Sequence, residues 1–299
     1  MEKGGFHLYS IITVLGWSIA YVFTRLALRH FSVYSLGFLR YLLASAILAP
    51  VVLALRIRPP ARRDAGLFAA SGAAGFFLYM IAFNTGSLTE TSATCSVMIA
   101  TAPVMTALLG RALYGEKLSS LQWIATAVEF AGILLLTVTN GRISVGAGIP
   151  WLILSAFLLS VFNLLQRKLT RTYSGLQASI YSIFAGAVML SVFMPSALKE
   201  AVSAPPAPLF FMAMLGVFSS AISYVSWSIA LKRAPDTSSV SNYMFLTPFL
   251  ATALGFVMAD ERPGAGVLIG GAVALSGVFL FNRGAARVSR PIKAPETRA

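Results

Sequence analysis

The stretch TAPVMTALLGRALYGEKLSSLQWIATAVEFAG (101–132) recurs without a gap as LTPFLATALGFVMADERPGAGVLIGGAVALSG (246–277), 145 residues further on. Apolar sequence of low complexity produces chance identities easily, but here the residues that interrupt the apolar runs also match. They are Pro103 and Pro248, Gly110 and Gly255, Glu116 and Glu261, and Gly132 and Gly277. The chain is therefore predicted to contain two copies of one structural unit.

The composition places both copies in a membrane. Of the 299 residues, 57% are hydrophobic and only 11% are charged, and the mean hydropathy is +0.79. A soluble chain would carry about 25% charged residues, and it could not hide this much apolar surface from water. This excludes most cytosolic enzymes and nucleic-acid-binding proteins.

Ten apolar runs are each about as long as the 20 helical residues that cross a bilayer. The first is longer than a signal-peptide core and lacks a small-residue cleavage site, so we expect it to be retained. The runs are 8–28, 34–55, 65–87, 91–113, 119–139, 147–168, 175–195, 207–232, 237–258 and 263–282. The predicted fold class is an all-α integral membrane protein.

The basic residues indicate the orientation of the spans. With both termini on the cytoplasmic side, 17 of the 23 Lys and Arg residues fall in cytoplasmic segments, as the positive-inside rule requires. Since each copy has five spans, an odd number, the second copy must be inverted relative to the first. We expect repeats at 1–141 and 142–284, followed by an unstructured basic cytoplasmic tail at 285–299.

The two copies resemble the EamA-type repeat of the drug/metabolite transporter superfamily. The segments that carry the resemblance are AFNTGSLTETSATCSVMIATAP (82–103) and the two stretches above, together with LGWSIAYVFTRLAL (15–28) and LRYLLASAIL (39–48). The resemblance implies ten helices around a central cavity, in a bacterial inner membrane. It also implies export of metabolites, with the aromatic amino-acid exporters of bacteria as the most similar type. One departure is Asp260 where the first copy has Gly115.

Polar and aromatic side chains far from the predicted span ends are candidates for the cavity wall. Such residues also occur at membrane interfaces, which is the alternative for each of them individually. The candidates are Trp17, Tyr21, Tyr79, Phe83, Met98, Thr101, Asn163, Tyr224, Trp227 and Tyr243. A largely apolar wall with a few hydrogen-bonding groups suits a zwitterion that has an apolar or aromatic side chain.

The mid-span prolines Pro103 and Pro248 are candidate hinges, together with the small residues Gly86 and Ser92. A proline removes one backbone donor and bends a helix, although neighbouring helices also tolerate a static kink. Both copies carry the bend, which favours a role in gating.

Two charged residues lie deep in predicted spans. Glu129 is a candidate proton-coupling site. The alternative, which we favour, is a protonated, hydrogen-bonded residue that faces another helix or a neighbouring protomer. Arg40 is the one deep basic candidate, and it either reaches the interface or pairs with a carbonyl.

Rival functions lack their motifs. The sequence has no H-E-x-x-H, G-x-S-x-G or P-loop pattern, so we expect neither an enzyme nor a nucleotide-driven pump. A channel would repeat its pore across identical subunits. We therefore expect a secondary transporter of amino acids, or alternatively of drugs or other metabolites, working by alternating access. It should need no metal or cofactor, bind no nucleic acid, and have a small-molecule substrate and the bilayer as partners. The sequence does not determine its oligomeric state, and a monomer is compatible with it.

Overall fold

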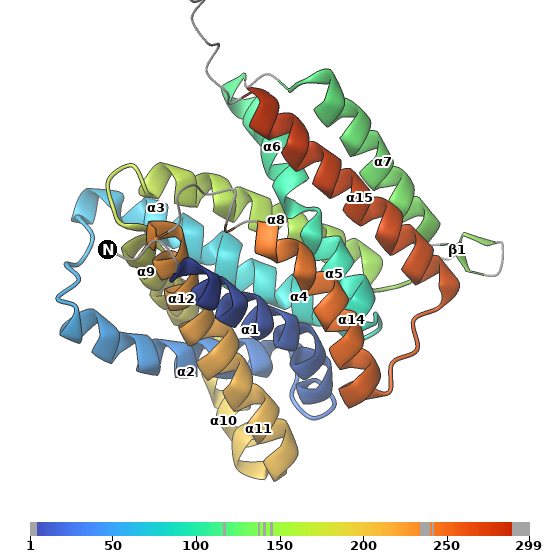
Figure 1. Ribbon diagram of the computed structural model, residues 1–299. Coiled ribbons are helices and arrows are strands. Elements are labelled where there is room, and N and C mark those ends of the chain that lie inside the picture. Colours follow the sequence, from blue (N-terminus) through green and yellow to red (C-terminus); the bar gives the residue numbers. More distant parts are fainter. Residues whose placement is uncertain are drawn as a thin grey trace, which may run out of the picture.

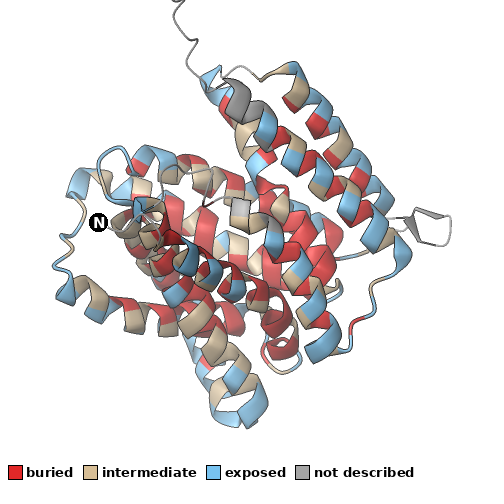
Figure 2. Cartoon of the chain, viewed as in Figure 1, coloured by how far each residue is buried: buried red, intermediate tan, exposed pale blue. Residues whose placement is uncertain are grey.

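A computed structural model describes residues 5–115, 118–136, 138–139, 142–143, 146–233, 240 and 242–288. Figure 1 shows a bundle of helices in which α7 and α15 lie side by side at one edge. Buried residues concentrate in the central helices, whereas the outward faces of α7 and α15 are exposed (Figure 2). Exposed Leu, Ile and Phe side chains, such as Leu134 and Ile269, give this edge the character of a lipid-facing surface.

The first half of the chain begins with two long helices and continues through two interrupted segments and one further helix. The elements are α1 (Phe6–Ala27), α2 (Val33–Ala54), the 3₁₀ turn η1 (Arg62–Asp64), α3 (Ala65–Gly72), the π-helical η2 (Ala73–Leu78), α4 (Tyr79–Ser87), α5 (Ser92–Ala100), α6 (Ala102–Tyr114) and α7 (Ser120–Leu136).

A short hairpin, β1 and β2, connects the first half to the second, and both are included in the elements given next. The elements are β1 (Val138–Thr139), β2 (Arg142–Ile143), α8 (Ile149–Leu169), α9 (Gly175–Leu190), η3 (Ser191–Phe193), α10 (Met194–Ser203), α11 (Pro206–Met214), the π-helical η4 (Leu215–Ile222), α12 (Ser223–Arg233), η5 (Asn242–Phe245), α14 (Leu246–Ala259) and α15 (Ala265–Val288).

Seven helical segments within the described residues are long and apolar enough to cross a membrane, and three shorter apolar helices accompany them. Hydroxyl side chains begin several of these segments. Ser32, Thr91 and Ser174 each accept a hydrogen bond from a backbone N–H in the first turn of α2, α5 and α9. Such N-caps satisfy donors that the helix itself leaves free.

The two π-helical segments occupy equivalent places in the two halves. η2 directly precedes Tyr79, and η4 ends one residue before Ser223 and two before Tyr224. Both segments pack closely on neighbouring helices. A Cβ on Gly75 would lie 2.3 Å from the ring of Phe162, and one on Gly216 would lie 3.0 Å from the carbonyl oxygen of Arg40.

The packing between the halves is reciprocal. η2 of the first half contacts α8 and α9, and η4 of the second half contacts α1 and α2. Likewise α6 contacts α8 while α14 contacts α1, and α7 contacts α15. Each half therefore completes its packing on the other.

The structure corrects several predicted boundaries. The seventh run continues to Ser203, because η3 turns the helix without ending it. The fifth run ends at Leu136. β1 pairs with β2 in the register Val138↔Ile143, and this hairpin contains the only strands in the described part of the chain. α15 extends to Val288, four residues into the predicted unstructured tail. Glu116 lies outside the described residues.

Candidate functional site

Trp17 lies at the middle of α1 and contacts two aromatic residues of α12. Its ring centroid is 5.6 Å from that of Tyr224, in an edge-to-face arrangement, and 5.4 Å from that of Trp227. All three side chains are only partly buried. The contact joins the first and last thirds of the chain through residues that the sequence analysis places together.

A second aromatic group lies one turn further along α1. The ring of Tyr21 meets that of Phe83 edge-to-face at 5.7 Å, and Phe83 stacks on Tyr79 at 5.7 Å. Phe83 is buried, whereas Tyr79 is partly exposed. These residues link α1 to α4.

Phe76, in η2, connects aromatic side chains from both halves. Its ring lies 5.8 Å from Tyr224, 5.2 Å from Tyr41 and 5.2 Å from Phe162. Rings that approach edge-to-face at these distances attract each other. An almost continuous layer of aromatic rings therefore crosses the middle of the bundle between the two halves.

Arg40 lies in α2 beside this layer and is only 6% exposed. Its Nε donates to the hydroxyl oxygen of Ser220 in η4 at 2.7 Å, its Nη1 is 3.9 Å from the sulfur of Met80, and its guanidinium lies 5.5 Å from the ring centroid of Tyr41.

Polar side chains cluster where α5 gives way to α6. Thr101 separates these helices, and its hydroxyl donates to the carbonyl oxygen of Met98 at 2.6 Å. From α8, Ser160 donates to the carbonyl oxygen of Ala102 at 2.9 Å, and Asn163 donates to the hydroxyl of Thr106 at 3.2 Å. Both Met98 and Thr101 are fully buried.

The two prolines begin helices instead of bending them. Pro103 is the second residue of α6, directly after the junction at Thr101, and Pro248 is the third residue of α14, directly after the 3₁₀ segment η5. The first turn of a helix tolerates proline because its N–H groups have no partner in the helix. Each predicted span is thus interrupted beside its proline.

Tyr243 lies at the N-terminal end of α1, apart from the other candidates. Its hydroxyl is within 2.5 Å of Nδ1 of His7, and it packs with Phe6, Ala230 and Val240. Trp227 packs against the same cluster, so it connects this end of the bundle to Trp17.

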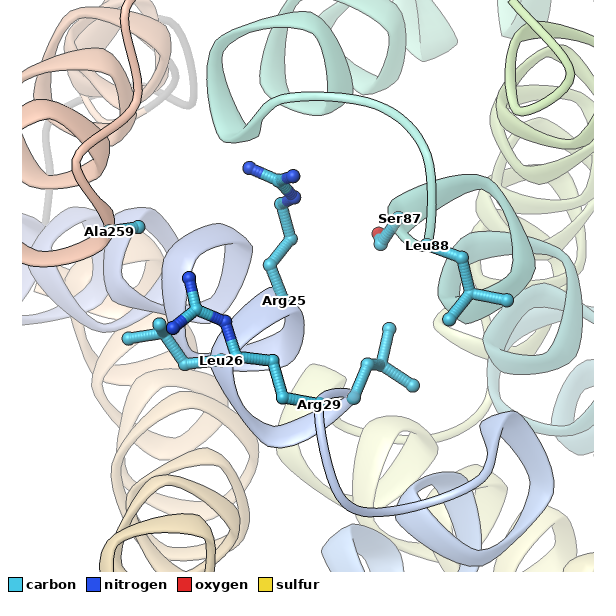
Figure 3. A pocket seen from close by; sticks show the side chains of 7 residues that line it. Arg25, Leu26, Arg29, Ser87, Leu88 and Ala259 are labelled. Carbon is cyan, nitrogen blue, oxygen red and sulfur yellow. The ribbon is translucent and has the colours of Figure 1, made fainter.

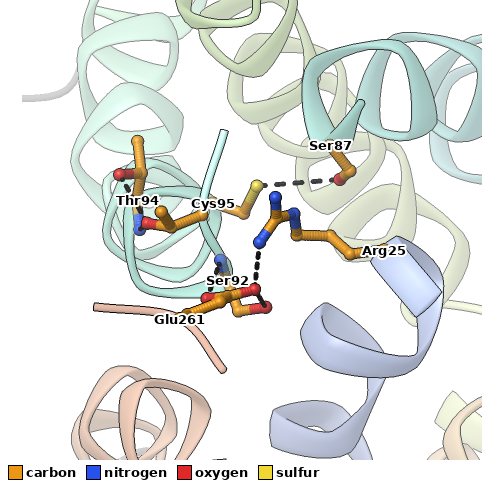
Figure 4. Close-up of polar contacts among 7 residues, drawn as sticks. Arg25, Ser87, Ser92, Thr94, Cys95 and Glu261 are labelled. Atoms are coloured by element: carbon orange, nitrogen blue, oxygen red, sulfur yellow. Dashed lines mark hydrogen bonds and ion pairs between the residues drawn. The ribbon is translucent and has the colours of Figure 1, made fainter. Parts of the chain in front are cut away.

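The opposite end of α1 carries an ion pair between Arg25 and Glu261 (Figure 4). The Glu261 carboxylate also accepts hydrogen bonds from the N–H and the hydroxyl of Ser92, each at 2.8 Å. Gly255 leaves space for it, since a Cβ there would lie 2.6 Å from a Glu261 oxygen. Ser92 thus anchors Glu261 at the start of α5.

A pocket of about 290 Å³ adjoins this ion pair and is lined by Arg25, Leu26, Leu28, Arg29, Ser87, Leu88 and Ala259 (Figure 3). A more open hollow of about 560 Å³ lies between the segments 57–63 and 172–177. Neither of these two pockets is lined by the predicted aromatic residues.

Gly86 and Glu129 both lie at contacts between helices. A Cβ on Gly86 would be 2.7 Å from Leu152 of α8, so this glycine permits a close approach of α4 to α8. Glu129 is 1% exposed in α7, and its Oε2 has no hydrogen-bond partner. It faces α15, where a Cβ on Gly277 would lie 2.6 Å from its backbone nitrogen.

The sequence profile of the EamA-like transporter family matches this chain twice, over residues 6–138 and 146–283. The chain belongs to the EamA-like transporter family. Like its relatives, it is a multi-pass membrane transporter and not an enzyme.

Several curated transporters are similar to this EamA-like transporter over most of their length. A probable terminal-alkyne amino-acid exporter of Streptantibioticus cattleyicolor is 32% identical, with 91% of this chain and 92% of that protein covered. The uncharacterized transporter YdfC of Bacillus subtilis is 25% identical over 88% of this chain and 86% of its own. An uncharacterized transporter of Archaeoglobus fulgidus is 28% identical over 92% and 96%.

A solved crystal structure shares the fold of this EamA-like transporter. The superposition has a TM-score of 0.61, covers 97% of this chain and 100% of the other, and relates sequences that are 19% identical.

The sequence marked Arg40 as a deep basic residue that reaches the interface or pairs with a carbonyl, but it did not indicate the partner found, the hydroxyl of Ser220 in η4. The charge of Arg40 was visible in an apolar run, but its partner Ser220 lies 180 positions away. No local pattern marks the π-helical turn that brings Ser220 to it.

Proposed function

We propose that this transporter exports amino acids with apolar or aromatic side chains. The observation that carries the proposal is the aromatic layer at the middle of α1, where Trp17 contacts Tyr224 and Trp227 of the other half. Flat, polarisable rings at the junction of two halves suit the side chain of such a substrate. The similarity to a probable terminal-alkyne amino-acid exporter, whose name specifies an amino acid with an apolar terminus, supports this substrate class.

The proposed architecture has ten spans in two inverted five-helix repeats, at 1–141 and 142–284, around a central cavity. The reciprocal packing of η2 on α8 and α9 and of η4 on α1 and α2 supports it. The backbone also supports it at the position where the two copies differ, Gly115 in the first and Asp260 in the second. Both residues adopt positive φ, at 67° and 52°, and each directly follows the helix that carries the proline of its copy. Asp is tolerated at this left-handed position, where glycine is the usual residue.

The proposed transport mechanism is alternating access. In the described conformation the end of the bundle near Arg25 is held together by the Glu261 contacts, and Glu200 of α10 accepts a hydrogen bond from the N–H of Ser32 at 2.8 Å. Opening of this end requires these contacts to break. The helix junctions beside Pro103 and Pro248 are the proposed hinges. Gly86 and Ser92 complete the set, at the two ends of the α4–α5 connection.

A substrate shifts such an equilibrium only by its difference in affinity for the two states. Since export ends with release to the outside, we expect tighter binding in the inward-open state. The distribution of basic residues supports cytoplasmic termini. A relative in Escherichia coli described as an inner membrane transporter supports the inner membrane as its location.

Efflux from intact bacteria tests the substrate class. Cells expressing the transporter and fed phenylalanine-containing dipeptides should release phenylalanine faster than cells with an empty vector at equal intracellular concentration. Serine- and glutamate-containing dipeptides provide the comparison for polar substrates. Faster loss of a cationic dye, with no change in amino-acid release, would overturn the proposal in favour of a drug exporter.

A further inference from the structure

We propose that Arg40, oriented by Ser220, binds the carboxylate group of the transported substrate. The inference rests on the proposed function and assigns the part of the substrate that the aromatic layer does not recognise. It makes a carboxylate a required feature of any substrate.

The first argument is the cost of the Arg40 charge. Its side chain is 6% exposed in a helix that lies among apolar residues. A guanidinium deep in a membrane protein is strongly unfavourable unless it is paired or hydrated. The ion pairs found within the described ranges join Arg25, Arg63 and Arg262 to carboxylates, but not Arg40. Its charge is therefore left for another anion to balance.

The second argument is the number of free donors. A guanidinium has five N–H groups in a planar fork. The described contacts use one strongly, from Nε to Ser220, and one weakly, from Nη1 to the Met80 sulfur at 3.9 Å. The fork fits the two oxygens of a carboxylate, which accept two parallel hydrogen bonds. Ser220 holds Nε and Met80 contacts Nη1 only weakly, so Nη2 and most of the donor capacity of Nη1 are free in the described contacts.

The third argument is position. Arg40 lies where α2 meets η4, and its guanidinium is 5.5 Å from the ring centroid of Tyr41. The Tyr41 ring is 5.2 Å from that of Phe76, which in turn lies 5.8 Å from Tyr224. The side chains of Tyr79, Tyr224 and Trp17 are partly exposed although they lie far from the span ends. A substrate with its carboxylate on Arg40 would place its side chain against this aromatic layer.

A purely structural role for Arg40 predicts something different. The guanidinium would then serve only to hold α2 against η4, where Gly216 already permits close contact. In that case loss of the charge would lower stability without changing which ligands bind. The two roles are separated by comparing an acid with its amide.

The experiment uses purified wild-type protein and Arg40→Gln in proteoliposomes. Counterflow of labelled phenylalanine, leucine and methionine is measured first, and then inhibition by each amino acid and by its amide. We expect the wild-type protein to prefer the acid by about 10-fold or more, the size of a charge-assisted hydrogen-bond pair. R40Q should lose most affinity for the acid and all preference over the amide.

Control variants separate this effect from misfolding. Arg29→Gln removes an exposed arginine on the neighbouring helix end and should leave the preference unchanged. Arg40→Lys keeps the charge without the fork, so it should retain part of the preference. Ser220→Ala should weaken acid binding about 3-fold to 10-fold. It also provides the test if R40Q does not give a single, monodisperse species.

Each outcome decides one claim. Exchange by the wild-type protein with equal inhibition by acid and amide would overturn the role of Arg40 and leave the proposed function standing. An undiminished preference for the acid in folded R40Q, or in both R40K and S220A, would also overturn the role of Arg40 and leave the proposed function standing. No exchange of any amino acid by folded wild-type protein would overturn the proposed function, and the inference with it.

Discussion

The carboxylate of Glu261, just after the end of α14, binds two residues far away in sequence: Arg25 at the end of α1 and Ser92 at the start of α5. It forms an ion pair with Arg25, 236 positions earlier, and accepts two hydrogen bonds from Ser92 at the start of α5. Glu261 is 6% exposed. One side chain of the second half therefore holds the end of α1 and the beginning of α5 together.

Loss of this carboxylate should loosen that end of the bundle. Cys95 is fully buried and lies one turn after Ser92, with its sulfur 3.6 Å from the Ser87 hydroxyl. In Glu261→Gln the ion pair is absent, and we expect Cys95 to react about 10-fold faster with a membrane-impermeant maleimide, as a change of about 1.4 kcal/mol in the opening equilibrium would give. Labelling of right-side-out vesicles measures this rate.

The matched control for this prediction is Arg29→Gln, which removes a neighbouring basic side chain of the same pocket without touching the ion pair. Its labelling rate should equal that of the wild-type protein. Equal rates in E261Q and the wild-type protein would contradict the role of Glu261 in closing this end.

Trp17 should be required for exchange. In Trp17→Ala the aromatic contacts with Tyr224 and Trp227 disappear. We expect the affinity for phenylalanine to fall about 10-fold, because each aromatic pair contributes about 0.5–1.5 kcal/mol. Trp151→Ala serves as the control, since Trp151 is 42% exposed at the beginning of α8. If W17A and W151A exchange phenylalanine equally well, the aromatic layer is not the binding surface.

The contact between α7 and α15 should depend on a glycine. A Cβ on Gly277 would lie 2.6 Å from the backbone nitrogen of Glu129 and 2.9 Å from the carbonyl oxygen of Ala125. Backbone atoms cannot yield as a flexible side chain can, so Gly277→Ala should destabilise the protein by about 1–3 kcal/mol. Gly264→Ala has no atom within 4 Å of the new Cβ and should stay within about 0.5 kcal/mol.

Thermal unfolding in detergent compares these two glycine variants. A lower midpoint for G277A than for G264A agrees with the close packing of the two helices. Identical midpoints would show that α7 and α15 do not approach each other as closely as described.

Glu129 should be dispensable for exchange. It faces α15 and lies at a different interface from the aromatic layer. Glu129→Gln keeps the shape and removes the charge, so we expect unchanged exchange of phenylalanine. Counterflow with and without an imposed pH gradient measures this. If the wild-type flux responds to the gradient and the E129Q flux does not, Glu129 is a proton-coupling residue after all.

Much of the architecture was predictable because it depends on local pattern. Apolar runs of sufficient length predicted where helices lie, and the matching residues Pro103 and Pro248 identified equivalent interruptions. The similar depth of Trp17, Tyr224 and Trp227 in their predicted spans marked each as a candidate for the cavity wall, but it did not predict that their rings are in contact. In each case the information lies within one run of about 20 residues or in the comparison of two such runs.

The remainder depends on contacts between distant segments. Nothing near Arg40 indicates Ser220, and nothing near Glu261 indicates Arg25, because those partners are set by how whole helices pack. The π-helical segments η2 and η4 contain Gly75 and Gly216, which lie close to neighbouring helices, and no local pattern in the sequence indicates these contacts. Tyr243 and Asn163 appeared equivalent to the other candidates by depth, yet they bind His7 and Thr106.

Counterflow into proteoliposomes tests the central claim most directly. Vesicles preloaded with unlabelled phenylalanine and containing purified transporter should accumulate labelled phenylalanine transiently, and competition should be strong for leucine and methionine and weak for serine and glutamate. Accumulation no greater than in protein-free vesicles, for every amino acid and with protein shown to be folded, would contradict the account.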